Sequence, residues 1–177
     1  MEYIYTYDSP LGIITMAGEN DSLTGLWIEG QKYFASSLKS DFKERLLPVF
    51  ENTINWLDIY FGGHAPNFTP SLKLKGTPFQ ILVWEILLKI PYGETVTYKD
   101  IAHEIANENG IEKMSAQAVG GAVGHNPISI IVPCHRVVGS NGSLTGYAGG
   151  IDKKLKLLTL EKADVSSLFV PKKGSAL

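Results

Sequence analysis

The first thirty residues alternate between apolar and polar positions, as β-strands with one buried face do. The alternation runs through EYIYTY, IITMAG and LTGLWIEG, and the turn-forming runs SPLG and ENDS separate these stretches. In the first stretch, Tyr3, Tyr5 and Tyr7 share one face. The pattern predicts three consecutive antiparallel strands, a β-meander.

Helical spacing follows these strands. Two helices are expected before residue 64, and the second shows apolar residues at helical intervals: Phe50, Ile54, Leu57 and Phe61. Gly62 and Gly63 then end this helix. The next segment, HAPNFTPSLKLKG, holds two prolines and little periodicity, so it is the expected connection between two domains. We therefore expect domains over residues 1–72 and 73–177.

The pattern of the second domain is helical. Thr77, Pro78 and Gln80 fit the cap, the first position and the third position of a helix. Another helix opens at Thr97, and Ser115 caps a further one through AQAVGGAVG. Two short helices joined by a polar loop predict a helix-turn-helix. The expected fold class is α/β, of the α+β kind, with a small antiparallel β-sheet domain followed by a helical domain.

The helix through AQAVGGAVG is rich in glycine. Gly120, Gly121 and Gly124 are poor helix formers, each costing about 1 kcal/mol relative to alanine. Two explanations are open: tight packing against another helix, or close approach of a ligand to the bare backbone.

Composition is that of an ordinary globular protein. The chain has 177 residues, of which 44% are hydrophobic, enough to bury a core. Its start, MEYIYTYDSPLG, has no basic leader, and no apolar run reaches membrane-spanning length. We expect a cytoplasmic protein that does not enter a membrane.

Charge argues against a strongly basic, DNA-binding surface. The formal net charge is −2, and Arg45 and Arg136 are the only arginines. The late lysines form a cluster of the kind that is commonly a solvated face: Lys153, Lys154, Lys156, Lys162, Lys172 and Lys173.

The single cysteine, Cys134, excludes an internal disulfide and a multi-cysteine zinc site. A lone cysteine is commonly a small buried apolar residue, but here Pro133 precedes it and His135 and Arg136 follow. A neighbouring base or cation stabilises a thiolate, and about 2 kcal/mol of stabilisation lowers the pKa by about 1.5 units. Because successive side chains of an extended segment point to opposite faces, a Cys134–His135 pair is one of two interpretations.

Longer motifs around this cysteine carry a resemblance. PCHRVV followed by NGSLTGYAGGIDKKLKLLTLE resembles the active-site signature of methylated-DNA–protein-cysteine methyltransferases, also called O6-alkylguanine-DNA alkyltransferases. The upstream stretch GTPFQILVWEILLKIPYGETVTYKDIA is similar to the helix that leads into that family's helix-turn-helix. The match runs from about Leu72 to Glu161. The N-terminal meander is compatible with the family's ribonuclease-H-like domain.

The resemblance implies roles for five residues of a catalytic set. Cys134 would be the alkyl acceptor, His135 the base that deprotonates it through a water, and Glu161 the carboxylate that orients His135. Tyr98 would give a proton or hydrogen bond to the departing guanine, and Asn126 would hold the active-site turn. Without the resemblance, Glu161 is an exposed helical carboxylate, Tyr98 a packed aromatic residue and Asn126 part of an ordinary turn.

The resemblance also implies residues that bind substrate and DNA. On the glycine-rich helix these are Gln117, Ala118, Gly120, Gly121 and Val123. Near the acceptor they are Arg136 as a structural or phosphate-facing cation, Val137 and Val138 on the pocket floor, and Tyr147, Ala148, Gly149 and Gly150 in the guanine-pocket loop.

The implied partner is double-stranded DNA that contains O6-alkylguanine. The damaged base would be flipped out of the duplex while the small-residue helix lies in the minor groove, and the protein would act as a monomer. Transfer would be irreversible because the thioether product has no good leaving group. No cofactor and no metal are expected, since the four histidines lack ligand spacing: His64, His103, His125 and His135.

Two positions depart from the family pattern. Gln117 stands where the family usually inserts an arginine into the base stack, and Ala148 stands where some relatives have a serine. A hydrogen bond of a charged group contributes about 1.5–3 kcal/mol, against about 0.5–1.5 kcal/mol for a neutral one. We expect base flipping to be less favourable, by up to about tenfold, and not abolished.

Three other functions fit part of the pattern. A pure binding module for alkylated DNA would lack the acceptor, whereas this chain has Cys134. A cysteine hydrolase built on Cys134, His135 and Glu161 would release product beyond one equivalent. A transcription regulator could use the helix-turn-helix, although relatives of that kind carry an additional segment with several cysteines.

Overall fold

The computed structural model describes residues 1–172, and it divides into two compact units. The first unit contains Met1–Lys75 together with Pro127–Ile131. The second contains Gly76–Asn126 and the chain from Val132 onward. The domain boundary expected from the sequence, between residues 72 and 73, stays a prediction. Lys173, in the late lysine cluster, lies outside the described residues.

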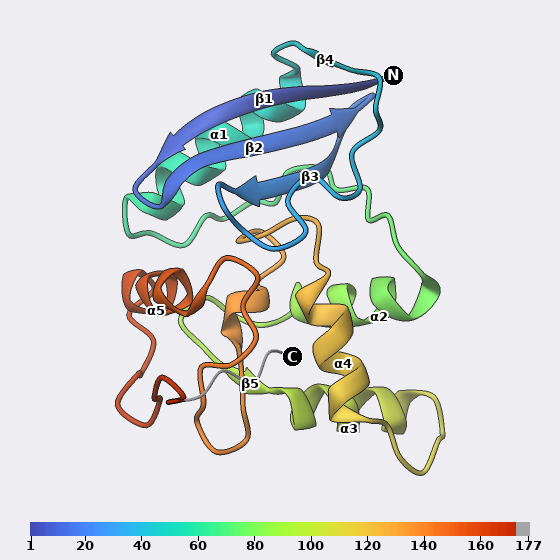
Figure 1. The fold of residues 1–177 in the computed structure, drawn as a ribbon, viewed down its shortest axis with the longest axis vertical. Coiled ribbons are helices and arrows are strands. Elements are labelled where there is room, and N and C mark those ends of the chain that lie inside the picture. Colours follow the sequence, from blue (N-terminus) through green and yellow to red (C-terminus); the bar gives the residue numbers. More distant parts are fainter. Residues whose placement is uncertain (173–177) are drawn as a thin grey trace. The chain divides into compact units, whose positions relative to one another are not determined.

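The first unit is built on a four-stranded sheet in the order β3-β2-β1-β4. Its strands are β1 (Glu2–Ser9), β2 (Gly12–Glu19), β3 (Ser22–Ile28) and β4 (Phe42–Glu44). The antiparallel pairing of β1 with β2 and of β2 with β3 confirms the predicted meander. The prediction of an antiparallel sheet is wrong at one edge, where β4 runs parallel to β1. The chain leaves β3 at one edge of the sheet and crosses to the other, so β4 enters beside β1 in the same direction (Figure 1).

One helix, α1 (Pro48–Phe61), packs on this sheet. The ring of Phe50 stacks on Tyr5 at 6.4 Å and that of Phe61 on Tyr7 at 6.3 Å. These contacts confirm the apolar face expected of the second helix. The first expected helix, before α1, is wrong, because residues 32–37 form turns in which Tyr33 has φ 56°. A helix interior does not accept this left-handed conformation.

The second unit is mainly helical (Figure 1). Its elements are α2 (Pro78–Leu87), β5 (Val96–Thr97), α3 (Tyr98–Glu108), α4 (Ala116–Gly124), the 3-10 helix η1 (Cys134–Arg136), β6 (Val137–Val138) and α5 (Ile151–Leu160). The expected helix starts are confirmed. The side chains of Thr77, Thr97 and Ser115 each accept a backbone N–H hydrogen bond three residues later. The two short strands β5 and β6 pair in parallel.

Helices α3 and α4 form the helix-turn-helix, and α4 presents a buried face made of Val119, Gly120, Ala122 and Val123. Trp84 of α2 fixes this packing, since its indole N–H donates to the carbonyl of Ala122 at 2.8 Å. Gly121 has open space where a Cβ would be. Tight packing therefore accounts for Gly120, and Gly121 is left as bare backbone on the outer face.

None of the helices among residues 1–172 has the length and apolar character that a membrane crossing requires.

Candidate active site

The acceptor candidate Cys134 begins η1, where the chain returns to the second unit at Val132. The side-chain amide of Asn126 donates to the Val132 carbonyl at 2.8 Å and to the Cys134 sulfur at 3.2 Å. Asn126 thus bridges the two ends of the 127–131 loop and contacts the thiol directly. The tight helical turn at Cys134 also removes the objection that His135 must point away, which assumed an extended chain.

The thiol lies in an environment that keeps it protonated at rest. Cys134 is 5% exposed, and burial raises the pKa of its thiol above the ordinary value. The hydrogen bond from Asn126 and the positive charge of Lys154 act in the opposite direction without overcoming burial. A base is therefore needed to generate the thiolate.

His135 and Glu161 supply such a base. Nε2 of His135 lies 2.7 Å from Oε1 of Glu161, the residue that ends α5, and both side chains are fully buried. Burial lowers the pKa of His135, and it outweighs the hydrogen bond and charge of Glu161, which raise that pKa. The imidazole is therefore neutral. Because an ionised Glu161 only accepts, Nε2 carries the proton and Nδ1 carries the basic lone pair.

Arg136 holds the carboxylate in place. Its guanidinium donates to both oxygens of Glu161, at 2.8–2.9 Å for the shortest bond to each oxygen, and to the carbonyl of Ile90 at 2.7 Å. Burial alone would raise the pKa of Glu161, but the hydrogen bonds from His135 and Arg136 lower it to about 2. Arg136 is 8% exposed, so of its two expected roles this geometry favours the structural one over contact with phosphate.

Tyr98 and Lys154 share one acceptor beside the thiol. The Tyr98 hydroxyl donates to the carbonyl of Thr145 at 3.0 Å, and the Lys154 ammonium donates to the same oxygen at 2.9 Å. Lys154 also makes a short hydrogen bond to the carbonyl of Val137. Burial raises the pKa of Tyr98, and a thiolate at Cys134 would raise it further, so the phenol stays a hydrogen-bond donor.

Lys154 is the functional candidate that the sequence analysis missed. It is 0% exposed, so its place in a solvated lysine face was wrong. Burial lowers the pKa of its ammonium to about 8. The sequence does contain a signal for this burial. Lys154 follows Ile151 by three positions and precedes Leu158 by four, which puts it on the apolar face of α5.

The loop before α5 contributes Tyr147, which is 8% exposed and lies edge-on to the His135 ring at 6.5 Å. Ala148 and Gly149 are half-buried, and Gly150, with φ 96°, starts α5. Val137 and Val138, the residues expected on the pocket floor, are both buried. Val138 belongs to a hydrophobic cluster with these residues: Leu144, Leu158 and Ala163.

The expected DNA-facing residues of α4 divide into two groups. Gln117, Ala118 and Gly121 are exposed. Gly120 and Val123 are buried, Val123 being 1% exposed, so they belong to the packed face of α4. Helical spacing turns these two residues toward the interior of their unit, and their expected role in DNA binding stays a prediction.

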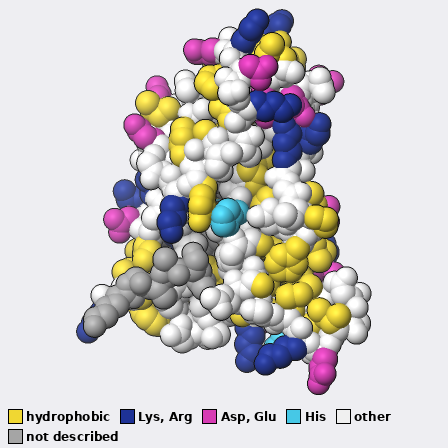
Figure 2. Space-filling model, turned by 45° about the vertical axis from the view of Figure 1, so that its right-hand side comes forward, with side chains coloured by type: hydrophobic (Ala, Val, Ile, Leu, Met, Phe, Trp, Pro, Cys, Tyr) yellow, Lys and Arg dark blue, Asp and Glu magenta, His cyan; other side chains and the backbone are white. Residues whose placement is uncertain are grey.

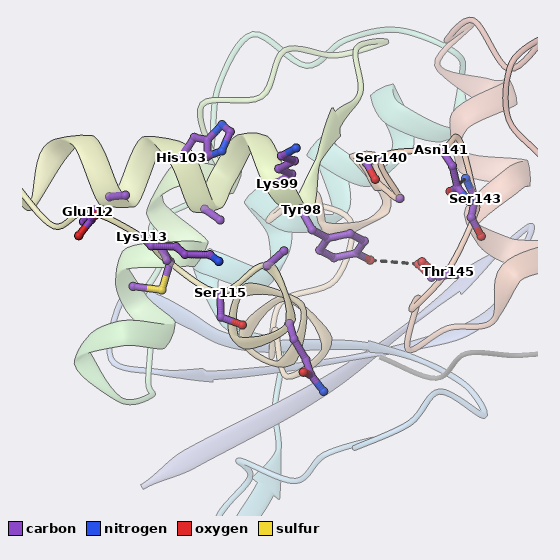
Figure 3. Close-up of a pocket in the computed structure, with 16 residues that line it drawn as sticks. Tyr98, Lys99, His103, Glu112, Lys113, Ser115, Ser140, Asn141, Ser143 and Thr145 are labelled. Carbon is purple, nitrogen blue, oxygen red and sulfur yellow. Dashed lines mark hydrogen bonds between the residues drawn. The ribbon is translucent and has the colours of Figure 1, made fainter.

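A cavity of about 990 Å³ adjoins Tyr98 (Figure 3). It is lined by one side of α3, the loop at residues 109–115, the start of α4 and the loop at residues 139–145. Gln117 and Thr145 are among the lining residues. Sequence analysis did not anticipate the ionisable side chains of its lining, which are Lys99, His103, Glu112 and Lys113. No group of three or more potential metal ligands gathers within residues 1–172.

Both units match models of one protein family. Residues 3–75 match the ribonuclease-like domain of 6-O-methylguanine DNA methyltransferase, and residues 78–163 match its DNA binding domain. The methylated-DNA–protein-cysteine methyltransferase of Mycobacterium tuberculosis is 45% identical over 92% of this chain and 94% of its own length. The inducible methylated-DNA–protein-cysteine methyltransferase of Bacillus subtilis is 40% identical over 90% of this chain and 86% of its own length.

Solved structures agree with these matches. The Mycobacterium tuberculosis OGT, crystallised in complex with DNA, superimposes with a TM-score of 0.79 at 43% identity, covering 94% of this chain and 99% of that one. An O6-methylguanine DNA methyltransferase from Methanococcus jannaschii gives a TM-score of 0.60 at 27% identity, covering 98% of this chain and 99% of that one. With its cysteine, histidine and glutamate assembled as described, the chain belongs to the family of methylated-DNA–protein-cysteine methyltransferases.

Proposed function

We propose that this protein repairs DNA by moving an alkyl group from O6 of guanine onto Cys134, once per molecule. The observation that carries the proposal is the buried thiol beside a neutral His135, whose Nε2 is held by Glu161 at 2.7 Å. Relatives that share 40–45% of the sequence bear the name of this activity.

The reaction follows from the roles of the side chains. Nδ1 of His135 takes the thiol proton through one water, and the thiolate attacks the alkyl carbon. A carbon–sulfur bond forms as the bond from that carbon to O6 breaks, and the electron pair stays with the guanine. Tyr98 donates a hydrogen bond to the departing base in place of its bond to Thr145. The thioether has no leaving group, so product formation stops at one equivalent, whereas a hydrolase would continue.

The alkylated base must leave the duplex to reach Cys134, at a cost of a few kcal/mol. We infer that α4 lies in the minor groove with Ala118 and Gly121 facing the DNA, because both residues are exposed and small. Gln117 fills the place of the base without a charge.

Replacing Gln117 with arginine is expected to tighten binding to duplex DNA by up to about tenfold, because a charged donor makes the stronger hydrogen bond. Fluorescence anisotropy of a labelled duplex measures this affinity. Asn52→Arg on α1 is the control, since Asn52 is exposed and the variant adds the same charge elsewhere. Unchanged or weaker binding by Gln117→Arg would remove Gln117 from the flipping step.

Lys154 is proposed to stabilise the thiolate, since it is the buried cation whose charge lowers the Cys134 pKa. In Lys154→Met we expect the apparent pKa for transfer to rise and transfer at neutral pH to slow about tenfold. The measurement is the pH profile of the transfer rate. Damage to the fold alone would lower the rate without moving the profile.

Lys156→Met is the matched control for Lys154, because Lys156 is exposed on the same helix. A pH profile of Lys154→Met that coincides with that of Lys156→Met would rule out an electrostatic role. An intermediate profile for Lys154→Arg, which keeps the charge, would support it.

We also propose that the protein works in the cytoplasm, as a monomer and without a cofactor. The proposed proton and alkyl transfers use only the side chains described above, which supports a reaction without a cofactor.

A further inference from the structure

We propose that Lys113, in the loop between α3 and α4, binds the DNA phosphate beside the flipped guanine. It thereby supplies the positive charge that Gln117 does not. The inference rests on the proposed repair function and concerns how this chain holds its DNA.

Lys113 and Gln117 line the same cavity as Tyr98. Figure 3 shows the Lys113 side chain extending from its loop into the space between α3 and the start of α4. Tyr98 and Thr145, which are joined by a hydrogen bond of 3.0 Å, both line the cavity, so it adjoins the proposed proton donor. At about 990 Å³ the cavity lies near the upper end of ligand pockets, which span roughly 300–1,000 Å³, so it has room for a nucleotide with its phosphate.

The cavity attracts an anion although the whole chain carries a net charge of −2. Two lysines, Lys99 and Lys113, line the cavity with one carboxylate, Glu112, so lysines outnumber carboxylates there by one. In the part of the chain that the structure describes, neither lysine forms an ion pair. On the face seen in Figure 2, basic and acidic side chains are interspersed, and no extended basic patch is visible.

The start of α4 adds to the positive electrostatic potential of the cavity. Its first turn holds no acidic residue, and Ser115 satisfies the N–H of Ala118. Backbone N–H groups at a helix start carry partial positive charge and favour anions. The cavity lining offers a further polar group, because the buried hydroxyl of Ser143 has no hydrogen-bond partner among residues 1–172.

Lys113 is suited to phosphate and not to reading bases. A lysine ammonium acts as a point charge, without the planar fork by which arginine reads base edges. Contacts to phosphate fix the position of a protein on DNA and carry no sequence information. The structure therefore assigns to Lys113 a positioning role that is independent of sequence context.

Salt dependence of duplex binding by Lys113→Gln tests the assignment. Each neutralised phosphate contributes about 0.9 to the slope of log affinity against log salt, so the slope should become shallower by about one, equally for unrelated sequences. Lys89→Gln is the control. It removes the same charge from a lysine that lies outside this cavity, 4.0 Å from Glu104. A slope for Lys113→Gln equal to that of Lys89→Gln would overturn the inference.

Free O6-methylguanine base separates this inference from the proposed function, because the base has no phosphate. The ratio of transfer rates from duplex and from free base should fall several-fold in Lys113→Gln and stay at the wild-type value in Lys89→Gln. An equal loss on both substrates would show that Lys113 acts on the chemistry or the fold, which overturns its assignment to phosphate. If the unaltered protein transfers from neither substrate, the proposed function itself fails.

Discussion

Replacing Cys134 with alanine is expected to abolish alkyl transfer completely while binding to duplex DNA persists. Cys134 is the only cysteine in the chain, so no second thiol can take over. The side chain is buried, and its hydrogen-bond partner Asn126 keeps its other bond, to the Val132 carbonyl. Alanine removes one sulfur atom and leaves the turn in place. Transfer from labelled O6-methylguanine DNA and binding to the same duplex are the two measurements.

Cys134→Ser provides the matched comparison for this experiment. Its hydroxyl keeps the approximate size and the hydrogen-bonding capacity of the thiol, but it is far less readily ionised by a neutral histidine. Both variants should therefore bind DNA and transfer nothing. Transfer that survives in Cys134→Ala would remove the cysteine from the mechanism.

Replacing Glu161 with glutamine is expected to destabilise the protein by about 3–5 kcal/mol and to stop transfer. The substitution keeps the shape but leaves the Arg136 charge buried without its carboxylate. It also removes the anion that fixes the proton of His135 on Nε2. Chemical denaturation gives the free energy of unfolding, and the transfer assay at a temperature where the variant is folded gives the activity.

Glu108→Gln is the control for Glu161, because Glu108 is exposed at the end of α3 and its loss should change stability little. Equal stabilities of the two variants would contradict the buried ion-pair network. The pH dependence adds a second criterion. The folded pKa of Glu161, about 2, lies below its ordinary value of 4.5. Its stabilisation is therefore complete above pH 4.5 and is lost as pH falls toward about 2. The difference from Glu161→Gln should shrink over that interval.

The sequence predicted the elements whose signals are local. Thr77, Thr97 and Ser115 cap helices as expected, because a capping side chain acts within three residues of itself. The meander could be predicted because alternation and tight turns are also local. The parallel strand β4 could not, since its pairing with β1 joins residues about forty positions apart and its own three residues carry no distinctive pattern.

The segment just before the acceptor makes contacts that local patterns do not reveal. Residues 127–131 pack with the first unit, where Leu26 donates its N–H to the Pro127 carbonyl at 2.8 Å and its carbonyl accepts the N–H of Ser129 at 2.9 Å. Such pairing between distant segments leaves no trace in the local pattern. An apolar run like Ile128–Val132 fits a buried strand, a helix or a loop equally.

The candidate site was predictable where the motif covered it. Proximity of Cys134, His135 and Glu161 followed from the resemblance, whereas adjacency in the chain left the pair undecided. Lys154 was missed because a lysine among lysines suggests a solvated face, and its burial depends on two backbone carbonyls, those of Val137 and Thr145. Lys113 was not singled out because its position matters only when the loop lies beside α3.

The central claim is that Cys134 accepts one alkyl group and keeps it, and intact-mass analysis tests it most directly. The protein is incubated with excess duplex DNA that carries O6-methylguanine, and the modified peptide is then mapped. We expect one added methyl group, located on Cys134, with no further product after one equivalent. An unchanged mass despite tight DNA binding, or guanine formed beyond one equivalent, would contradict this account.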